Sequence, residues 1–149
     1  MKLYYAKGAC SLAVRIIIHE LNLNTEFISV DLKTKKTEHG DDYFKINPKG
    51  SVAALALPNG EILTENVVIM QYLADMNNDS HVLAPMKDLK RYRTLEWSNY
   101  ITTEIHKSFG PFFTPNYPED FRKNNLLPLL ENKFQLIEDH LKMSTETTC

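Results

Sequence analysis

The sequence has 149 residues, of which 43% are hydrophobic and 24% are charged, and its formal net charge is −2 at pH 7. This composition is typical of a globular protein and provides no basic face of the kind that binds nucleic acid. No apolar stretch suits a transmembrane helix or a signal peptide, and the two cysteines, Cys10 and Cys149, lie at opposite ends of the chain, so we expect a cytoplasmic protein without a disulfide framework.

The first twenty residues predict a strand followed by a helix. Residues 3–6 are typical of a short strand, and Gly8 is free to adopt the positive φ that a tight turn needs. Apolar residues then recur at helical spacing, namely Ala13, Val14, Ile17, Ile18 and Leu21. Cys10 and Ser11 are therefore expected where the strand becomes a helix.

The position of Cys10 has chemical consequences. The N-terminus of a helix has unpaired backbone N–H groups and the positive end of the helix dipole, which together stabilise a thiolate relative to its thiol. Lys7 adds a nearby positive charge. Cys10 is therefore a candidate nucleophile. The alternative is structural, with Cys10 as a small packing residue and Ser11 as an ordinary helix cap.

The next segments predict a small mixed sheet. Residues 27–30 form an apolar strand, which the preceding helix would place parallel to the first strand in a right-handed βαβ unit. Residues 31–36 are polar and basic, as in a solvated loop. Residues 41–46 suit a short helix that stops before Pro48.

Two more strands and a helix complete the first predicted domain. Residues 50–57 predict a third strand, residues 58–60 a hairpin turn, and residues 61–64 a fourth strand antiparallel to the third. A helix follows from Glu65-Asn66 through Asp75, with Asn66 as its N-cap. Four strands with these helices, in the order βαβ, short helix, ββα, are a thioredoxin-like arrangement, which we assign to residues 1–77.

Residues 78–85 are predicted to be a linker, and residues 86–149 a second, all-α domain. Residues 86–109 contain no proline or glycine and predict one long helix that ends at Gly110-Pro111. A second helix is expected over residues 119–141, in which Pro128 either introduces a kink or marks the true start. Residues 144–149 are expected to be a polar tail.

Both helices have distinct faces. The second should bury Leu130, Phe134, Ile137 and Leu141. The first has a polar stripe made of Glu96, Asn99, Thr103 and His106, which is either wholly solvated or lines a wet cleft against the first domain. The spacing of His, Cys and carboxylate residues predicts no metal site, and the absence of a second cysteine near Cys10 argues against a dithiol oxidoreductase.

Several short motifs, in order along the chain, carry a family resemblance. They are residues 1–5 before Ala9-Cys10-Ser11-Leu12, Asp31-Leu32 before residues 34–37, Ile46-Asn47-Pro48-Lys49-Gly50, Leu63-Thr64-Glu65 before residues 69–73, and Glu104-Ile105-His106-Lys107 before Phe109 and Pro111. Their order and spacing over residues 1–141 resemble bacterial glutathione S-transferases of the cysteine-containing beta class.

The resemblance implies a thioredoxin-like domain followed by an all-α domain, and usually a homodimer. It also implies detoxification chemistry in which glutathione, acting as a co-substrate, is conjugated to a small hydrophobic electrophile or exchanges disulfides through Cys10. No metal, nucleic acid or membrane is implied. Phe109, Phe112 and Phe113 are candidates for the hydrophobic half of the site.

The resemblance also assigns site residues by position. Cys10 would lie against the glutathione sulfur and can form a mixed disulfide with it, while His106 and Lys107 would complete the catalytic set. Val52 would pair its backbone with the cysteinyl unit, Glu65 and Asn66 would hold the γ-glutamyl end, and Lys35 would face the glycyl carboxylate. Asn99 would reach the sulfur from the second domain, and Tyr5 and Ser11 complete the expected glutathione-binding set.

Three positions depart from the family pattern. The family has a cis-proline directly after Val52, where this chain has Ala53. Because a cis bond before a residue other than proline costs about 3–4 kcal/mol, we expect a trans bond there and weaker glutathione binding. Asn66 replaces a small residue but can still donate to a carboxylate, and Lys7 replaces a proline, which should loosen the loop before Cys10.

The last departure is the ending. Family members continue beyond Leu141 with further helices, whereas residues 142–149 do not resemble that continuation, so we expect a truncated or frameshifted second domain with an incomplete core and marginal stability. Two functions follow as alternatives. Cys10, Glu65, His106 and Lys107 favour a glutathione transferase, while Ala53 and the short ending favour a catalytically impaired remnant of that fold that acts as a binding module.

Overall fold

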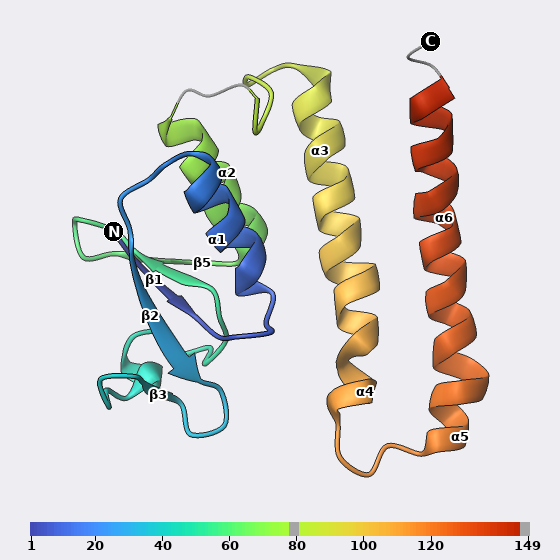
Figure 1. Ribbon diagram of the computed structural model, residues 1–149, viewed down its shortest axis with the longest axis horizontal. Coiled ribbons are helices and arrows are strands. Elements are labelled where there is room, and N and C mark those ends of the chain that lie inside the picture. Colours follow the sequence, from blue (N-terminus) through green and yellow to red (C-terminus); the bar gives the residue numbers. More distant parts are fainter. Residues whose placement is uncertain (78–80, 147–149) are drawn as a thin grey trace. The chain divides into compact units, whose positions relative to one another are not determined.

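The computed structural model describes residues 1–77 and 81–146, with side chains up to residue 143. The chain divides into two compact units, Met1–Tyr92 and Arg93–Cys149. The first unit contains a sheet and two long helices, and the second is helical (Figure 1). The predicted linker over 78–85 includes residues 78–80, which lie outside the described residues, so those boundaries remain predictions.

The first unit is built on a five-stranded mixed sheet of order β3-β2-β1-β4-β5. Its strands are β1 (Lys2–Tyr5), β2 (Glu26–Asp31), β3 (Lys36–Thr37), β4 (Ala54–Ala56) and β5 (Ile62–Thr64). As the sequence predicts, β1 and β2 are parallel, with Leu3 opposite Phe27, and β4 and β5 form an antiparallel hairpin. The remaining pair, β1 with β4, is antiparallel and sets Leu3 opposite Leu55.

Residues 32–35 form a turn, in agreement with the predicted loop over residues 31–36, but the edge strand β3 that follows was not predicted. The carboxylate of Asp31 accepts hydrogen bonds from the backbone N–H groups of Lys33 and Thr34, at 2.7 and 3.2 Å, which turns the chain back on itself. Thr37 then pairs with Val30. The polar composition of this segment hides a strand because β3 is only two residues long and lies at the edge of the sheet.

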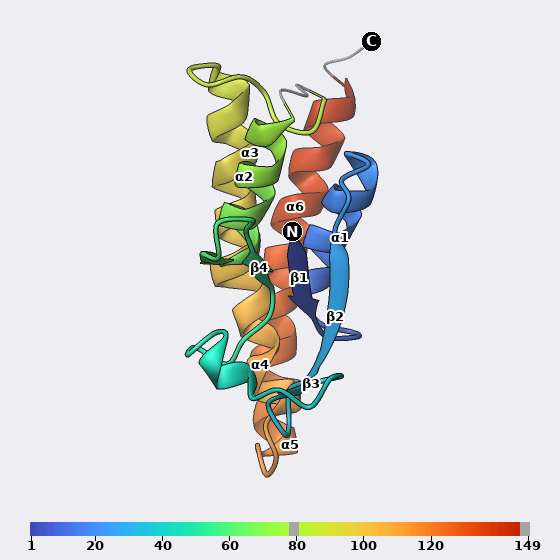
Figure 2. The ribbon, with the colours of Figure 1, turned by 90° about the vertical axis from the view of Figure 1, so that its left-hand side faces the viewer.

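Helices cover the sheet as the hydrophobic pattern predicts. The helices α1 (Ser11–Glu20) and α2 (Asn66–Met76) pack side by side on one face, where Val14, Ile18, Ile69 and Leu73 form a core with Leu3 and Leu55 (Figure 1). On the other face the short 3-10 helix η1 (Tyr43–Lys45) buries Tyr43 against Val30, Val52 and Ala54. Figure 2 shows η1 near the β3 end of this unit. This layered arrangement is a thioredoxin-like fold.

The second unit has two helical arms joined by the loop at residues 114–118 (Figure 1). The first arm contains most of α3 (Leu89–Tyr100), the π-helix η2 (Ile101–Ile105), the 3-10 helix η3 (His106–Phe109) and α4 (Gly110–Phe113). The second contains α5 (Glu119–Phe121), the π-helix η4 (Arg122–Leu126) and α6 (Leu127–Glu146). Helical backbone thus begins at Glu119, as predicted, and Pro128 does not mark its start, because it lies in the first turn of α6 directly after the π-helix η4.

Three predictions for these helices are wrong. The first arm is not one continuous α-helix, and Gly110-Pro111 does not end it, because proline is tolerated in the first turn of a helix and here opens α4. Nor does a tail begin at Ser144, since α6 continues to Glu146. Residues 142–146 contain no glycine or proline to stop the helix, and residues 147–149 lie outside the described residues.

The expected buried face of the second helix is only partly buried. Leu130 is buried and Ile137 is half-buried, but 48% of Phe134 and 55% of Leu141 are exposed. Helical periodicity identifies an apolar face without identifying what covers it. Within residues 1–77 and 81–146, no helix is both long enough and apolar enough to cross a membrane.

Candidate functional site

Cys10 lies at the start of α1, as the sequence predicts. Gly8 has a φ of 71° and turns the chain between β1 and α1, and Cys10 occupies the N-cap position. The half-buried Cys10 thiol donates a hydrogen bond to the backbone carbonyl oxygen of Val52, with the two atoms 3.3 Å apart. The thiol is thus directed at the segment that precedes β4, which makes this segment the natural centre of the site.

The hydroxyl of Ser11 is fully buried and does not cap α1. It donates to the carbonyl oxygen of Ala6 and accepts from the Ala6 N–H, at 3.3 and 3.2 Å. These two bonds fix the turn that places Cys10. The Ser11 side chain is therefore committed to the fold, and its contribution to glutathione binding remains a prediction.

Residues 49–53 form what we term the central segment, and buried side chains hold its backbone. The carbonyl oxygen of Ser51 accepts hydrogen bonds from the Tyr43 hydroxyl and from the Asn47 amide, both at 2.8 Å. Burial raises the pKa of the Tyr43 hydroxyl, so this group remains a donor at neutral pH. The ammonium of Lys35 donates to the Gly50 carbonyl oxygen at 2.7 Å.

Gly50 is required by its geometry. Its φ is 63°, and a Cβ atom built on it would lie 2.6 Å from Cε1 of Phe44. An L-residue here would face both an unfavourable backbone conformation and a collision with an aromatic ring. The glycine therefore allows the central segment to pass close to η1.

The expectation of a trans Val52–Ala53 bond is wrong, because the bond is cis. Both residues are at least nine-tenths buried. The Val52 carbonyl accepts from Cys10, and the Ala53 N–H donates to Oδ1 of Asn66 at 3.3 Å. A cis bond before a residue other than proline persists where the surrounding structure holds both sides of the peptide. The expectation of a trans bond was based on the intrinsic free-energy cost of the cis form alone.

The start of α2 completes the surroundings of the central segment. Glu65, with a φ of 72°, is the N-cap residue, and Asn66 is the first residue of the helix. The predicted N-cap role of Asn66 is therefore wrong, because its side chain turns to Ala53. Glu65 accepts a hydrogen bond from the ammonium of Lys49 at 2.7 Å, and Lys49 also donates to the Thr64 hydroxyl at 3.0 Å.

Five of the predicted site residues converge on the central segment from four parts of the first unit. These are Cys10, Lys35, Val52, Glu65 and Asn66. Lys49, Tyr43 and Asn47 join them but were not among the predicted site residues. The asparagine before Pro48 was the available signal, because asparagine side chains commonly bond to nearby backbone groups in turns.

Tyr5 has a different set of neighbours. Its ring lies edge-on to Phe27, with centroids 6.3 Å apart, and the guanidinium carbon of Arg15 lies 4.5 Å from its centroid. Its predicted contact with glutathione has no support from these neighbours and remains a prediction.

The other predicted residues belong to the second unit. His106 and Lys107 are exposed and begin η3, and Asn99 is exposed on α3, where its carbonyl oxygen accepts from the Thr103 hydroxyl at 3.0 Å. Phe109 contacts Phe134, with ring centroids 6.3 Å apart. The roles of these residues in the site remain predictions.

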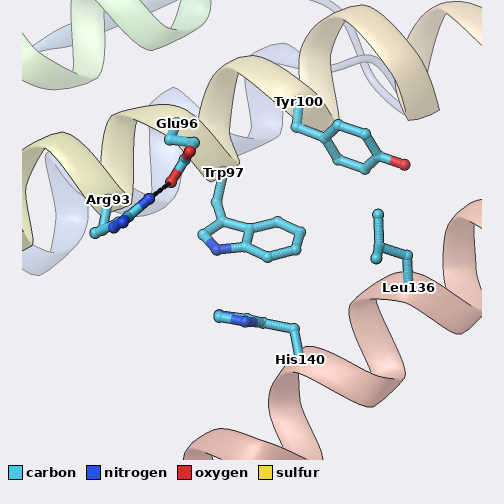
Figure 3. A pocket seen from close by; sticks show the side chains of 6 residues that line it. All are labelled: Arg93, Glu96, Trp97, Tyr100, Leu136 and His140. Carbon is cyan, nitrogen blue, oxygen red and sulfur yellow. Dashed lines mark hydrogen bonds and ion pairs between the residues drawn. The ribbon is translucent and has the colours of Figure 1, made fainter.

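A separate pocket of about 390 Å³ lies between α3 and α6 (Figure 3). Its most prominent contact is between Trp97 and His140, whose ring centroids are 4.3 Å apart with planes 35° from parallel. An ion pair between Arg93 and Glu96, at 2.7 Å, lies at its edge. No predicted site residue lines this pocket. Over residues 1–77 and 81–146, no three His, Cys or carboxylate side chains are grouped as a metal site would need.

Comparison with known proteins agrees with the geometry of the first unit. The model for "Glutathione S-transferase, N-terminal domain" matches residues 8–76, which include every side chain that converges on the central segment. Glutathione S-transferase GstA of Escherichia coli O157:H7 is 51% identical over 142 residues, which cover 95% of this chain and 70% of that protein. The chain belongs to the glutathione S-transferase family.

Solved structures place the chain more closely within this family of enzymes. A bacterial beta-class glutathione S-transferase from Sphingomonas chungbukensis superimposes with a TM-score of 0.88 at 38% identity. A sphingomonad glutathione S-transferase complexed with glutathione gives a TM-score of 0.89, also at 38% identity. Each match covers 95% of this chain and 70% of the relative. The beta-class resemblance read from the sequence is thus confirmed.

Proposed function

We propose that this glutathione S-transferase chain binds glutathione along the central segment and presents its sulfur to Cys10. The observation that carries this proposal is the convergence of α1, α2, Lys35 and the Val52–Ala53 peptide on residues 49–53. Two helices begin here, with Cys10 and Glu65 as their N-cap residues, and helix N-termini favour anions. The complex of the sphingomonad relative with glutathione supports the choice of ligand.

The charges of glutathione fit this arrangement. A γ-glutamyl group has an ammonium and a carboxylate. The ammonium would contact the carboxylate of Glu65, and the carboxylate would contact the amide of Asn66 and the N–H groups at the start of α2. Lys35 would face the glycyl carboxylate by exchanging its bond to the Gly50 carbonyl oxygen. The cysteinyl unit would then pair with the Val52 backbone, and its sulfur would lie near Cys10.

Two reactions follow from a sulfur held at the start of α1. In conjugation, the glutathione thiolate forms a bond to an electrophilic carbon, the leaving group departs with its electron pair, and the thiol proton passes to a base. In exchange, the Cys10 thiolate attacks the glutathione sulfur of a disulfide between glutathione and a small thiol, which releases the small thiolate and leaves Cys10 in a mixed disulfide with glutathione. A second glutathione thiolate then attacks the mixed disulfide, releasing glutathione disulfide and restoring Cys10.

We assign the second unit a supporting role in this chemistry. His106 and Lys107 supply an imidazole and an ammonium for proton transfer and charge stabilisation, and Asn99 orients the sulfur side. The aromatic residues Phe109, Phe112 and Phe113 favour a small hydrophobic electrophile. We further propose that the chain works in the cytoplasm as a homodimer, as its beta-class resemblance implies.

One experiment with two arms tests this function. The full chain is assayed for conjugation of glutathione to a nitroaryl halide, and its intact mass is measured after exposure to glutathione disulfide. We expect turnover and one glutathione adduct, and Cys10→Ser should remove the adduct while Cys149→Ser should retain it. A folded chain with neither turnover nor an adduct contradicts the proposal.

A further inference from the structure

We infer that Lys133, on α6, is a positioning residue that holds the backbone register of residues 104–108 and thereby orients His106 and Lys107. The inference rests on the proposed function, because it takes these two residues as part of the catalytic machinery. It comes from a feature of the second unit that sequence reasoning did not anticipate, namely a change of helix type at the place where the two residues occur.

The change of helix type is abrupt. The His106 N–H donates to the carbonyl oxygen of Ile101, five residues back, as in a π-helix. The Gly110 N–H donates to the carbonyl oxygen of Lys107, only three residues back, as in a 3-10 helix. A wide turn is thus followed at once by a narrow one. The directions of the side chains between them differ from those on a regular α-helix, and π turns occur frequently at functional sites.

Lys133 bridges this junction from the opposite arm. Its ammonium donates to the backbone carbonyl oxygen of Glu104 at 2.7 Å, to the Glu104 carboxylate at 3.0 Å and to the Ser108 hydroxyl at 3.1 Å. An ammonium has three N–H donors, and each has an acceptor here. The Ser108 hydroxyl in turn donates to the same Glu104 carbonyl oxygen. One cation therefore ties both ends of residues 104–108.

The surroundings make this contact stronger than an ordinary surface ion pair. Only 16% of the Lys133 side chain is exposed, compared with 50% for Glu104. Hydrogen bonds from a charged donor are about twice as strong as hydrogen bonds between neutral groups. Water replaces such bonds poorly at a partly buried site, so their loss costs free energy. The residues between the two tied positions are Ile105, which is buried, and the exposed pair His106 and Lys107.

The geometry gives Lys133 a role distinct from general stabilisation. Without it, the carbonyl of Glu104 loses a charged donor and the junction can relax toward regular α-helix. Such a change rotates His106 and Lys107 around the helix axis by tens of degrees while leaving the arm helical. Because misplacement by about 1 Å can cost about a hundred-fold in rate, loss of Lys133 should lower turnover more than stability.

The test compares Lys133→Met, which keeps the length of the side chain, with Lys133→Arg and the matched control Lys123→Met at an exposed lysine of η4. We expect Lys133→Met to lower kcat for conjugation about ten-fold with KM for glutathione changed less than two-fold. Lys133→Arg should recover most of the loss, and Lys123→Met should match the parent chain. A ten-fold rise in KM with unchanged kcat contradicts the inference.

A second background separates positioning from a merely structural effect. In a chain with both His106→Ala and Lys107→Ala, adding Lys133→Met should reduce the remaining turnover less than two-fold, because the groups that Lys133 orients are already absent. An equal ten-fold loss in both backgrounds would overturn the inference, since it would show that Lys133 acts through general stability.

Amide hydrogen exchange tests the inference even if the chain shows no turnover, and the proposed function fails only if the glutathione adduct is absent as well. We expect Lys133→Met to accelerate exchange at residues 105–109 at least ten-fold, with exchange in α1 unchanged, and Lys123→Met to leave residues 105–109 as they are. Unchanged exchange in Lys133→Met would show that this lysine does not hold the junction.

Discussion

At the scale of single residues, the side chain of Asn66 has a different role from the one that its sequence position predicts. Its position before an apolar helical stripe is typical of an N-cap, yet Glu65 occupies the N-cap position and Asn66 opens the helix. The side-chain oxygen Oδ1 of Asn66 instead accepts a hydrogen bond from the Ala53 N–H. A local motif cannot predict this contact, because the two residues are brought together only when the β4–β5 hairpin folds back.

We predict that Asn66→Ala weakens glutathione binding by about two- to ten-fold. A hydrogen bond contributes about 0.5–1.5 kcal/mol, and each 1.4 kcal/mol corresponds to a factor of ten in affinity. The loss should arise because the Ala53 N–H is left without this acceptor and because the Asn66 amide no longer donates to the γ-glutamyl carboxylate. Titration calorimetry with glutathione measures the effect.

Asn24→Ala, at an exposed asparagine before β2, is the control and should bind as the parent chain does. Equal affinity of Asn66→Ala and the parent chain would mean that the contact with Ala53 does not support the ligand site.

Residues with reactive or charged side chains were easier to predict from the sequence than residues whose side chains hold the backbone of the site in place. Cys10, Lys35 and Glu65 are reactive or charged, and all three lie around the central segment, while their contacts with glutathione remain a proposal. Lys49, Tyr43 and Asn47 were missed because their role is to hold another residue or a backbone carbonyl, a role that needs the folded loop. The cis Val52–Ala53 bond was missed for the same reason.

At the scale of elements, an ion pair within the first unit joins α2 to the start of α3. The guanidinium of Arg91 makes two parallel hydrogen bonds to the carboxylate of Asp75, at 2.8 and 2.7 Å, and also donates to the carbonyl oxygen of Ala84 at 3.2 Å. Only 9% of the Arg91 side chain is exposed, compared with 48% for Asp75. The hydrogen bonds from Arg91 lower the pKa of Asp75 below its usual value of 3.8.

This pair predicts a pH dependence of stability. The pKa of Asp75 is lower in the folded chain than in the unfolded chain, so its stabilising contribution is fully present above the unfolded value, about 4, and is lost as the pH falls through the lower folded value. Asp75→Asn should therefore reduce the midpoint of thermal unfolding by several degrees at pH 6, and the difference from the parent chain should shrink below pH 4. Thermal unfolding at several pH values measures this.

Glu131→Gln, at an exposed carboxylate of α6, provides the control and should differ little from the parent chain at any pH. A difference between Asp75→Asn and the parent chain that stays constant from pH 6 to pH 3 would contradict the assignment of the effect to this carboxylate.

Element types were predicted more reliably than helix registers. The βαβ unit and the β4–β5 hairpin follow from apolar patterning and turn residues, which are local signals. The transition from α to π to 3-10 helix in the first arm was not predicted, because the composition of residues 101–109 is compatible with a continuous helix. The contact from Lys133 comes from 25 to 29 residues away in the sequence.

At the scale of the whole molecule, the first unit is organised so that one segment meets the starts of two helices. The sheet brings β1 and β4 together, and the turns after β1 and β5 then direct Cys10 and Asn66 to the Val52–Ala53 peptide. The strand order that defines the fold therefore also brings the residues of the candidate site together. The match of residues 8–76 to the glutathione S-transferase N-terminal domain covers this arrangement.

The second unit shows where sequence patterning is insufficient. Periodicity located the apolar positions of α6 correctly, but burial depends on neighbours that periodicity does not specify. Leu130 is buried while Phe134 and Leu141 are about half exposed. The placement of His106 and Lys107 likewise depends on the register of the first arm, and their share in catalysis is a proposal that Lys133 variants test.

The most direct test of the central claim is a titration of the isotope-labelled full chain with glutathione, followed by amide chemical shifts. We predict saturable shifts concentrated at Cys10, Lys35, Val52, Glu65 and Asn66, with much smaller changes around Trp97 in the separate pocket. Saturable shifts centred on Trp97 and His140, or no shifts at the central segment at millimolar glutathione, would contradict the account.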